Sequence, residues 1–419
     1  MAWSHVLDLS PVSTNTGERP RLLVFNQYYW PAVEATAHLL TELCEGLADE
    51  YDITVVAGAH PDAAHGRSRR GGVEIVRVAS TSYDRRSLSL RALNYLTYVG
   101  LSTAAGMGAR RPDIVLCMTD PPFLGDVAKV VAGRFRAPLV VITQDVFPEI
   151  AVQLKRLESP SLVLLMRVLV GAYLRSADRV VAIGETMRGR LEAKGADPQR
   201  LRVIPNWVDT ASLFPQPRDN EWARTRHLGN KFVVMHSGNV GHAQDLESLV
   251  RAATFLRDLD RLRIVIVGSG ARHDDLVRLA RRLEVGHVRF FPYQPRELLS
   301  RSLSSADIHV VGLARGLAGF VVPSRFYGVL AVGQPVIVAA DEESETARVV
   351  REVGCGVVVP PARPELLAGA IRDAYDGRLD LEDMGRRGRE YVVAEADREV
   401  ALRRYRELLR EVRLERAAA

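Results

Sequence analysis

Arg325 occupies a position where a helix would not by itself favour a positive charge. It lies in the stretch "GFVVPSRFYGVLAVGQPVIV", whose spacing predicts a helix from about Ser324 to Val332, closed by Gly333 and stopped by Pro335. Ser324 is a candidate N-cap, and a cation in the first helical turn opposes the helix dipole unless an anion is bound there. The stretch therefore indicates a phosphate site anchored by Arg325, although an Arg325 that points into water fits the same pattern.

A glycine-rich turn follows the strand predicted by "KFVVMH". Small residues let the backbone approach a ligand closely, and the free N–H groups at the start of the next helix, near Asp245, favour an anion. The candidate ligand-binding residues of this turn are Ser237, Gly238, Asn239 and Gly241. A tight strand-to-helix turn that holds no ligand is the alternative.

A second glycine turn, Gly268 to Gly270, follows the strand predicted by "LRIVIV" and precedes Arg272. The G-x-G-x-x-G spacing of a dinucleotide site is missing, which argues against a nicotinamide-dependent oxidoreductase. Gly268 and Arg272 remain candidate phosphate contacts at the same edge of the sheet.

Short β-branched runs alternate along the chain with longer amphipathic ones, the pattern of a parallel sheet wrapped by helices. Continuous Val and Ile runs mark strands that are covered on both faces, and ligands bind beyond the carboxyl ends of such strands. The predicted strands are 21–27, 51–58, 73–80, 113–119, 138–145, 178–184 and 201–206 in the first half, and 231–239, 262–270, 288–292, 307–313, 335–340 and 356–361 in the second.

The length of 419 residues indicates two α/β domains rather than one. We expect a loose extension at 1–20, a first doubly wound domain at 21–209, a linker at 210–230, a second such domain at 231–395 and a C-terminal helix at 396–419. The linker is placed in a stretch that has no sustained period of either kind.

The composition is that of a soluble globular protein, with 47% hydrophobic residues and a net charge of +5. This mild charge does not indicate nucleic acid. The three cysteines, Cys44, Cys117 and Cys355, lie far apart in apolar surroundings and are typical of buried core residues in a reducing compartment. With no signal peptide pattern in the first 20 residues, a cytoplasmic protein is expected.

Seven sequence blocks in a fixed order resemble a known family. They are "NQYYWPAVEATAHLLTEL", "TDPPFLG", "VITQDVFPE", "VIPNWVD", "HSGNVGHAQDLESLVRAA", "VPSRFYGVLAVGQPVI" and "GCGVVVPP", and they run from about Leu22 to Arg389. The chain resembles the GT-B glycosyltransferases of family 4, in the bacterial branch typified by the WbuB and WcaI type enzymes of surface-polysaccharide assembly. The resemblance implies two Rossmann-like domains that face each other across a cleft, with sugar nucleotide held mainly by the second and acceptor mainly by the first.

The chemistry that the resemblance implies is transfer of a sugar from a nucleoside diphosphate donor with retention of anomeric configuration. The donor would be a UDP-, GDP- or dTDP-sugar, with no further cofactor and no metal. Negative charge that builds on the departing diphosphate must be stabilised, by Arg325 and by backbone N–H groups between Gly238 and Gly241. The resemblance implies no carboxylate nucleophile, and the Asp-x-Asp at Asp258 to Asp260 precedes a strand and is expected at the surface.

Three residues of "QDVFPE" match the block that lines the acceptor side in similar enzymes: Gln144, Asp145 and Glu149. Asp145 follows its strand directly and is better placed for the cleft than Glu149, although it could instead cap the following turn. Asn206 is expected to fix the connection between the domains rather than to touch substrate.

The sequence departs from the wider family at four positions. Asn239 and Gln244 stand where many family 4 enzymes have Arg and Lys, and Phe320 and Gly328 stand where many have a Glu-x7-Glu pair whose second member holds the ribose. Glu345 is a candidate replacement for the ribose contact, or else only a favourable charge at a helix start.

Two apolar segments that contain arginines, 84–111 and 161–178, allow peripheral contact with the inner face of an anionic membrane. Packing against the sheet explains them as well. The acceptor would accordingly be lipid-linked or, alternatively, a soluble small molecule. A sugar-nucleotide 2-epimerase and a non-catalytic nucleotide-sugar binding protein of the same fold are further alternatives.

Overall fold

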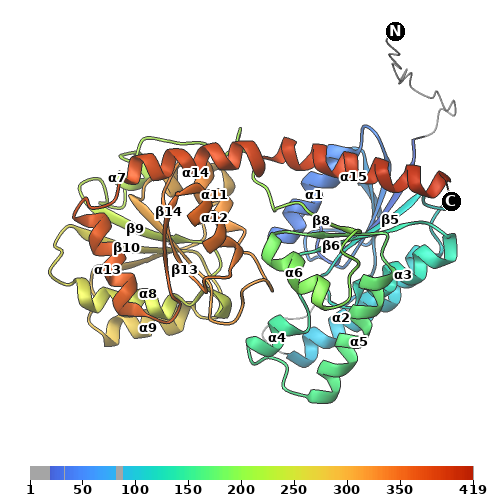
Figure 1. The fold of residues 1–419 in the computed structure, drawn as a ribbon, viewed down its shortest axis with the longest axis horizontal. Coiled ribbons are helices and arrows are strands. Elements are labelled where there is room, and N and C mark those ends of the chain that lie inside the picture. Colours follow the sequence, from blue (N-terminus) through green and yellow to red (C-terminus); the bar gives the residue numbers. More distant parts are fainter. Residues whose placement is uncertain (1–18, 33, 82–87, 419) are drawn as a thin grey trace, which may run out of the picture.

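The computed structural model describes residues 19–32, 34–81 and 88–418 and contains two α/β domains (Figure 1). The first is built on an eight-stranded sheet with the order β3-β4-β2-β1-β5-β6-β7-β8. Its strands are β1 (Arg21–Phe25), β2 (Asp52–Ala57), β3 (Gly66–Arg70), β4 (Val73–Arg77), β5 (Ile114–Met118), β6 (Leu139–Thr143), β7 (Arg179–Ala182) and β8 (Leu201–Val203). Its helices are α1 (Ala35–Leu47), α2 (Leu88–Met107), α3 (Leu124–Phe135), α4 (Glu149–Gln153), α5 (Pro160–Ser176) and α6 (Glu185–Ala193).

The second domain is built on a six-stranded parallel sheet with the order β11-β10-β9-β12-β13-β14. Its strands are β9 (Phe232–Ser237), β10 (Leu262–Val267), β11 (Val288–Phe291), β12 (Ile308–Gly312), β13 (Val336–Ala339) and β14 (Gly356–Val359). Its helices are α7 (Glu221–Arg224), η1 (His242–Gln244), α8 (Leu246–Ala252), η2 (Ala253–Leu256), α9 (His273–Arg282), η3 (Arg296–Leu298), α10 (Leu299–Ser304), α11 (Arg325–Ala331), α12 (Glu345–Val353), α13 (Pro364–Tyr375) and α14 (Leu381–Glu395), and α15 (Arg398–Ala418) completes the chain.

Every strand that the sequence predicts is present, and most of these strands are apolar and buried. All five residues of β5 and of β6 are buried, as strands covered on both faces require. The exception is β3, which the sequence did not predict. Its residues, GRSRR, are all exposed, and it pairs antiparallel with β4 at the sheet edge, so that backbone hydrogen bonds rather than apolar burial define it.

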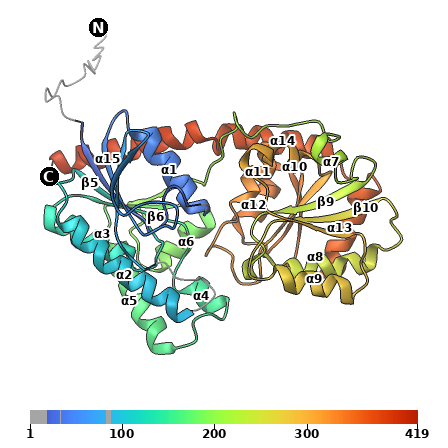
Figure 2. The same ribbon diagram turned by 180° about the vertical axis from the view of Figure 1, so that it is seen from behind.

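The chain crosses between the domains twice, and the two crossings are paired. At the first, Val208 accepts a hydrogen bond from Arg398 N and donates one to Ala396 O, each 3.0 Å long. At the second, α14 ends on the second domain and α15 continues back over the first (Figures 1 and 2). The C-terminal helix expected at 396–419 is therefore part of the first domain's core, and its apolar residues pack with those of α1.

The segment 210–230, which we expected to be a linker, belongs structurally to the second domain. It contains α7, whose Trp222 is buried against Val233 and Val267 of the second sheet. Asn220 caps α7 by accepting hydrogen bonds from the backbone N–H groups of Trp222 and Ala223. The first crossing from one domain to the other is therefore confined to the few residues around Val208.

The carboxyl edges of the two sheets face each other. After β6, Asp145 forms an isolated antiparallel bridge with Val321, which follows β12. Beside it, Val146 N donates to Phe320 O at 2.9 Å. Since ligands of parallel sheets bind beyond this edge, the domain junction is where a ligand site is expected.

No helix among the residues that the structure describes is both long and apolar enough to cross a membrane.

The packing of α15 on the first domain yields a stability prediction. Leu409 is fully buried and Leu414, on the same helix, is 71% exposed. We expect Leu409→Ala to lower the free energy of unfolding by about 2 to 5 kcal/mol, through lost burial and a residual cavity, and Leu414→Ala to change it by less than about 0.5 kcal/mol. Urea titrations followed by circular dichroism check both values, and equal effects would contradict the packing of α15.

Candidate functional site

Arg325 lies at the junction of the domains and is held by a histidine. Its Nη1 lies 2.9 Å from Nε2 of His236, the penultimate residue of β9. The guanidinium also lies beside Gly238, where an added Cβ would be 3.3 Å from Arg325 Nε. Burial lowers the pKa of Arg325 to about 10, and the nearby Tyr293 phenol offsets part of that effect. Arg325 therefore remains a cation at neutral pH.

The shorter contact of each ring nitrogen assigns the tautomer of His236. Nε2 lies 2.9 Å from Arg325 Nη1 and 3.4 Å from Asn239 O, and Nδ1 lies 3.3 Å from Val310 O and 3.4 Å from Arg325 Nη1. A guanidinium can only donate, so His236 Nε2 accepts from Arg325 and must be unprotonated. The other nitrogen, Nδ1, carries the proton and donates it to Val310 O at 3.3 Å. Burial, reinforced by the charge of Arg325, lowers the pKa of His236 well below its ordinary value. A neutral, buried ring thus fixes the orientation of Arg325.

The two glycine turns pack against each other. Gly268 has φ +140°, and an added Cβ would lie 1.9 Å from the carbonyl oxygen of Gly238. Gly270 has φ +155°, and its Cβ would lie 2.4 Å from Val240 O. Only glycine allows this approach, so the close packing of two loops already accounts for both glycines.

Most N–H groups of the first glycine turn are used within the protein, contrary to our expectation that they face a diphosphate. Gly238 N donates to Val267 O and Val240 N to Ser269 O, both at 2.9 Å. Gly241 N donates to Gln244 Oε1 at 2.9 Å. Gly268 N likewise donates to Phe291 O at 3.0 Å. The turn therefore forms part of the surface beside Arg325 but offers few free N–H groups to an anion. The positive charge at the candidate site comes from Arg325.

Ser324 precedes α11 but makes no capping hydrogen bond through its side chain, contrary to the cap that the sequence predicted. Ser324 is exposed, and the side chain of Asn239 is exposed beside the glycine turn. Ser237 is partly buried at the end of β9. These three polar residues lie near Arg325 in the fold, because α11 and β9 both contribute to the same edge.

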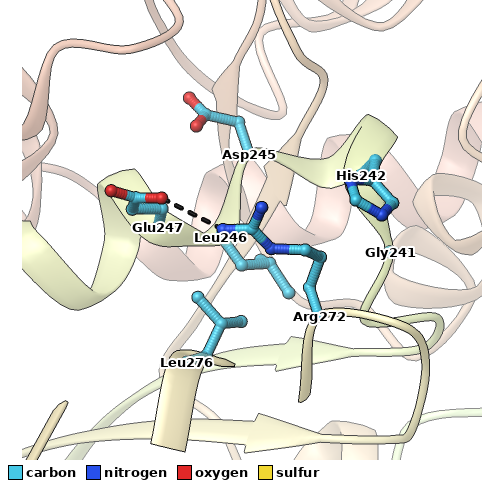
Figure 3. Close-up of a pocket in the computed structure, with 7 residues that line it drawn as sticks. All are labelled: Gly241, His242, Asp245, Leu246, Glu247, Arg272 and Leu276. Atoms are coloured by element: carbon cyan, nitrogen blue, oxygen red, sulfur yellow. Dashed lines mark hydrogen bonds and ion pairs between the residues drawn. The ribbon is translucent and has the colours of Figure 1, made fainter. Parts of the chain in front are cut away.

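Arg272 is neutralised by carboxylates. Its Nη2 lies 3.2 Å from Glu247 Oε2 and its Nε lies 3.4 Å from Asp275 Oδ2. Figure 3 shows Arg272 directed at Glu247, with Asp245 pointing away, in a pocket of about 120 Å³. The structure therefore shows Arg272 ion-paired beside the glycine turn, and its predicted phosphate contact stays a prediction.

Asp145, a candidate for the acceptor side, has a shifted pKa. Burial, followed by the charge of Asp120, raises the pKa of Asp145 to about 7. Asp120 follows β5 and Asp145 follows β6, so the two carboxylates stand on neighbouring strands at the carboxyl edge. Such a shift is typical of groups that handle protons or bind hydroxyls.

Gln144 and Glu149, the other two candidates for the acceptor side, are engaged elsewhere. Gln144 and Asn206 form a buried reciprocal amide pair, with hydrogen bonds of 3.0 and 2.9 Å. Glu149 makes ion pairs with Arg167 at 3.1 Å and Lys194 at 2.7 Å. Both residues make contacts within the first domain, and the role of Asn206 in the connection between the domains stays a prediction.

Glu345 is buried at the domain junction. Its Oε2 accepts hydrogen bonds from the backbone N–H and the hydroxyl of Thr186, at 3.1 and 3.3 Å, and its Oε1 pairs with Arg348. Thr186 lies in the first turn of α6, where a carboxylate is favoured. Since both carboxylate oxygens are occupied, the structure does not support the ribose contact predicted for Glu345.

The two positions that lack family carboxylates are filled by packing. The guanidinium of Arg190 lies over the ring of Phe320, and the distance from Arg190 Cζ to the centre of that ring is 4.9 Å. At Gly328, an added Cβ would touch Leu213 at 3.6 Å. The local surroundings suit an aromatic ring and a glycine, and the ribose partner is left unassigned.

Sequence reasoning missed His236 and Tyr293. His236 reads as a strand residue in "VVMHSGN", and only the fold shows that it meets Arg325, which is 89 residues away. Tyr293 follows β11 and is 60% exposed, an aromatic surface next to the guanidinium. The available signal was a polar or aromatic residue at the carboxyl end of a parallel strand, inside β9 for His236 and two residues after β11 for Tyr293.

Within residues 19–32, 34–81 and 88–418, no group of three or more His, Cys, Asp or Glu side chains could hold a metal ion. Asp258 of the Asp-x-Asp sequence is exposed and paired with Arg372 at 2.8 Å, away from the junction. That a metal is not required stays a prediction.

Two family models match the chain, one on each domain. The Glycosyl transferase 4-like domain matches residues 35–207, and Glycosyl transferases group 1 matches residues 217–391.

Relatives of known sequence include WbjE of Pseudomonas aeruginosa, named as a glycosyltransferase, which is 30% identical over 279 residues, covering 66% of this chain and 69% of that one. WcaI of Escherichia coli, named for colanic acid biosynthesis, is 31% identical over 237 residues, covering 55% and 57%.

Solved structures share the fold at low sequence identity. Sucrose-phosphate synthase from Thermosynechococcus elongatus has a TM-score of 0.78 at 18% identity, covering 96% of this chain and 100% of that one. HepE of Anabaena has a TM-score of 0.72 at 15% identity, covering 94% and 100%. The chain therefore belongs to the GT-B glycosyltransferases of family 4, in the WcaI-like branch.

Proposed function

We propose that this glycosyltransferase moves a sugar from a nucleoside diphosphate donor to a lipid-linked acceptor in the assembly of a bacterial surface polysaccharide or glycolipid, with retention of configuration. The observation that carries the donor assignment is the Arg325 cation, held by His236 at the carboxyl edge of the second sheet. Solved structures of HepE contain UDP and UDP-glucose, which makes UDP the first nucleotide to test, before GDP and dTDP.

In the proposed reaction the bond from the anomeric carbon to the diphosphate oxygen breaks, and a bond from the acceptor oxygen forms on the same face of the sugar. The electron pair of the broken bond stays on the diphosphate, which takes the acceptor's hydroxyl proton. Arg325 stabilises the negative charge that develops there. This stabilisation lowers the activation barrier most when the hydrogen-bond donors, here the N–H groups of Arg325, are already oriented before the reaction. The fixed tautomer of His236 supplies that preorganisation. No metal takes part in this proposal.

Asp145 has the acceptor role in the same proposal. Its carboxylate, when ionised, accepts a hydrogen bond from the acceptor hydroxyl and orients it toward the sugar. The bridge between Asp145 and Val321 places it next to the segment that leads into Arg325. The three cysteines are all unpaired and buried, which supports the proposal that the enzyme works in the reducing cytoplasm.

The first test concerns the donor. Arg325→Ala is expected to weaken UDP binding and to lower turnover together, by roughly ten- to hundredfold, because a charge-assisted hydrogen bond contributes about 1.5 to 3 kcal/mol. Calorimetric titration with UDP, GDP and dTDP measures the affinity, and Arg386→Ala on the exposed face of α14 is the control. Unchanged nucleotide affinity would reject Arg325 as the anchor.

Incubation with donor alone separates transfer from epimerisation, since an epimerase converts donor without acceptor.

A second test isolates the positioning role of His236. His236→Phe keeps a ring but removes the acceptor for Arg325, so we expect about tenfold weaker UDP binding. His236→Gln retains an acceptor oxygen and should recover part of the affinity. If Phe and Gln weaken UDP binding equally, the hydrogen bond to Arg325 has no functional role and His236 acts only by packing.

A third test uses pH. Since the pKa of Asp145 is raised to about 7, the carboxyl is neutral below that pH and ionised above it, so kcat/KM for the acceptor should fall as pH drops below about 7. Asp145→Asn should raise the acceptor KM and remove this acid limb. Asp126→Asn is the control, since the pKa of Asp126, on α3, is also raised, to about 6. A wild-type profile that is flat from pH 5.5 to 8 would contradict the role.

A further inference from the structure

A pocket of about 390 Å³ lies at the amino edge of the second sheet, where the neighbouring strands β9, β10 and β12 begin. Phe232, which lines it, is the first residue of β9, whereas His236, which orients Arg325, lies near the other end of that strand. Because a strand rises about 3.3 Å per residue, roughly 17 Å of β9 separates its two ends. The pocket is therefore separate from the candidate site at the domain junction. We call it the amino-edge pocket, and its lining side chains are those of Arg218, Lys231, Phe232, Arg261, Asp307 and Tyr375.

One ion pair forms a fixed side of the amino-edge pocket. Arg218 donates to both carboxylate oxygens of Asp307, at 2.7 and 2.8 Å. Its other N–H groups donate to three backbone oxygens of the loop 228–231. Every N–H group of this guanidinium is therefore used within the protein, and its charge is balanced by Asp307. The pair holds the loop in place and leaves the binding of a ligand's charge to other residues.

Two further cations line the pocket without a carboxylate of their own. In the part of the chain that the structure describes, the ammonium of Lys231 has no hydrogen bond or ion pair, and the guanidinium of Arg261 contacts only Asn230 O, at 3.3 Å. The described lining residues include no carboxylate besides Asp307. Like charges in one pocket repel each other, and an anion bound between them removes that repulsion. The charge of the pocket therefore suits an anion.

The pocket also has an aromatic wall. The rings of Phe232 and Tyr375, the last residue of α13, meet edge to face with centroids 5.4 Å apart, and both side chains are partly exposed. An aromatic face attracts the apolar surface of another ring, and a cation pairs with phosphate oxygens. The volume of about 390 Å³ lies in the range of sites that hold small organic molecules. Charge, wall and volume together suit a small molecule that carries both a ring and a phosphate.

We propose that the amino-edge pocket binds a small phosphate ester that carries a ring, either a sugar phosphate or a nucleotide. Lys231 and Arg261 hold the phosphate, and Phe232 and Tyr375 contact the ring. The proposal goes beyond the proposed function and does not depend on it, because none of these residues lies at the domain junction.

Calorimetric titration with glucose 6-phosphate, AMP and inorganic phosphate tests the site. We expect the wild-type chain to bind at least one ester with a Kd of about 1 mM or below, and about tenfold more tightly than inorganic phosphate, because contacts to the ring add to the ion pairs. A double variant, Lys231→Gln with Arg261→Gln, should bind that ester at least about tenfold more weakly. The matched control, Arg281→Gln with Arg282→Gln at two exposed positions of α9, removes the same charge and should bind as the wild type does.

Further titrations identify the ester and its place. Tighter binding of glucose 6-phosphate assigns a sugar phosphate, and tighter binding of AMP assigns a nucleotide. Tyr375→Leu keeps an apolar side chain but removes the ring, so it should weaken ester binding severalfold and leave inorganic phosphate unaffected. Arg325→Ala should leave ester binding unchanged, since Arg325 lies beyond the opposite edge of the sheet. Circular dichroism spectra of the variants should match that of the wild type.

Four results would overturn the proposal. They are failure of both esters to bind at about 10 mM, equal weakening by the two double variants, inorganic phosphate binding as tight as that of the esters, and loss of ester binding in Arg325→Ala. The second would show that the effect comes from net charge alone, and the last would place the ester at the domain junction.

Discussion

The buried carboxylate of Glu345 holds the two domains in register. A buried charge is costly unless it is fully paired, and this one is paired by the backbone and hydroxyl of Thr186 in the other domain and by Arg348 in its own. Gly184 is needed beside it, since an added Cβ would lie 2.6 Å from the Glu345 carboxyl carbon. This contact supports the facing of the two carboxyl edges, together with the ion pair between Arg296 and Glu42 at 2.9 Å and the hydrogen bond from Val146 N to Phe320 O.

In the second domain the glycine turns and Arg325 have different roles at the carboxyl edge of the sheet. The glycine turns satisfy their own backbone groups, and Gln244 closes on Gly241 through its side chain, where a lysine would have pointed a cation outward. The guanidinium of Arg325 lies at the edge beside Gly238, and a neutral imidazole orients it. Because His236 is buried and stays unprotonated, the orientation of Arg325 does not change with pH in the physiological range.

The fold was largely predictable because its causes are local. Buried parallel strands are continuous apolar runs, so thirteen of the fourteen strands in the described part of the chain were located from such runs. The exposed GRSRR strand β3 carries no such signal. The site was less predictable. Arg325 and Asp145 were proposed from the sequence because each stands next to a predicted strand or helix end, and both remain candidates. Gln144, Glu149 and Arg272 have equally suitable positions, but their side chains are paired with Asn206, Lys194 and Glu247.

The sequence by itself indicated the two sheets, the edge at which ligands of such sheets are expected, and the family through its ordered blocks. Only the tertiary structure decided which polar groups at that edge remain available. The reason is physical, since hydrogen bonds and ion pairs join residues far apart in the chain, such as Arg325 with His236 and Glu345 with Thr186. The sequence indicates at which strand or helix end a side chain lies. Only the fold determines which distant side chain it contacts.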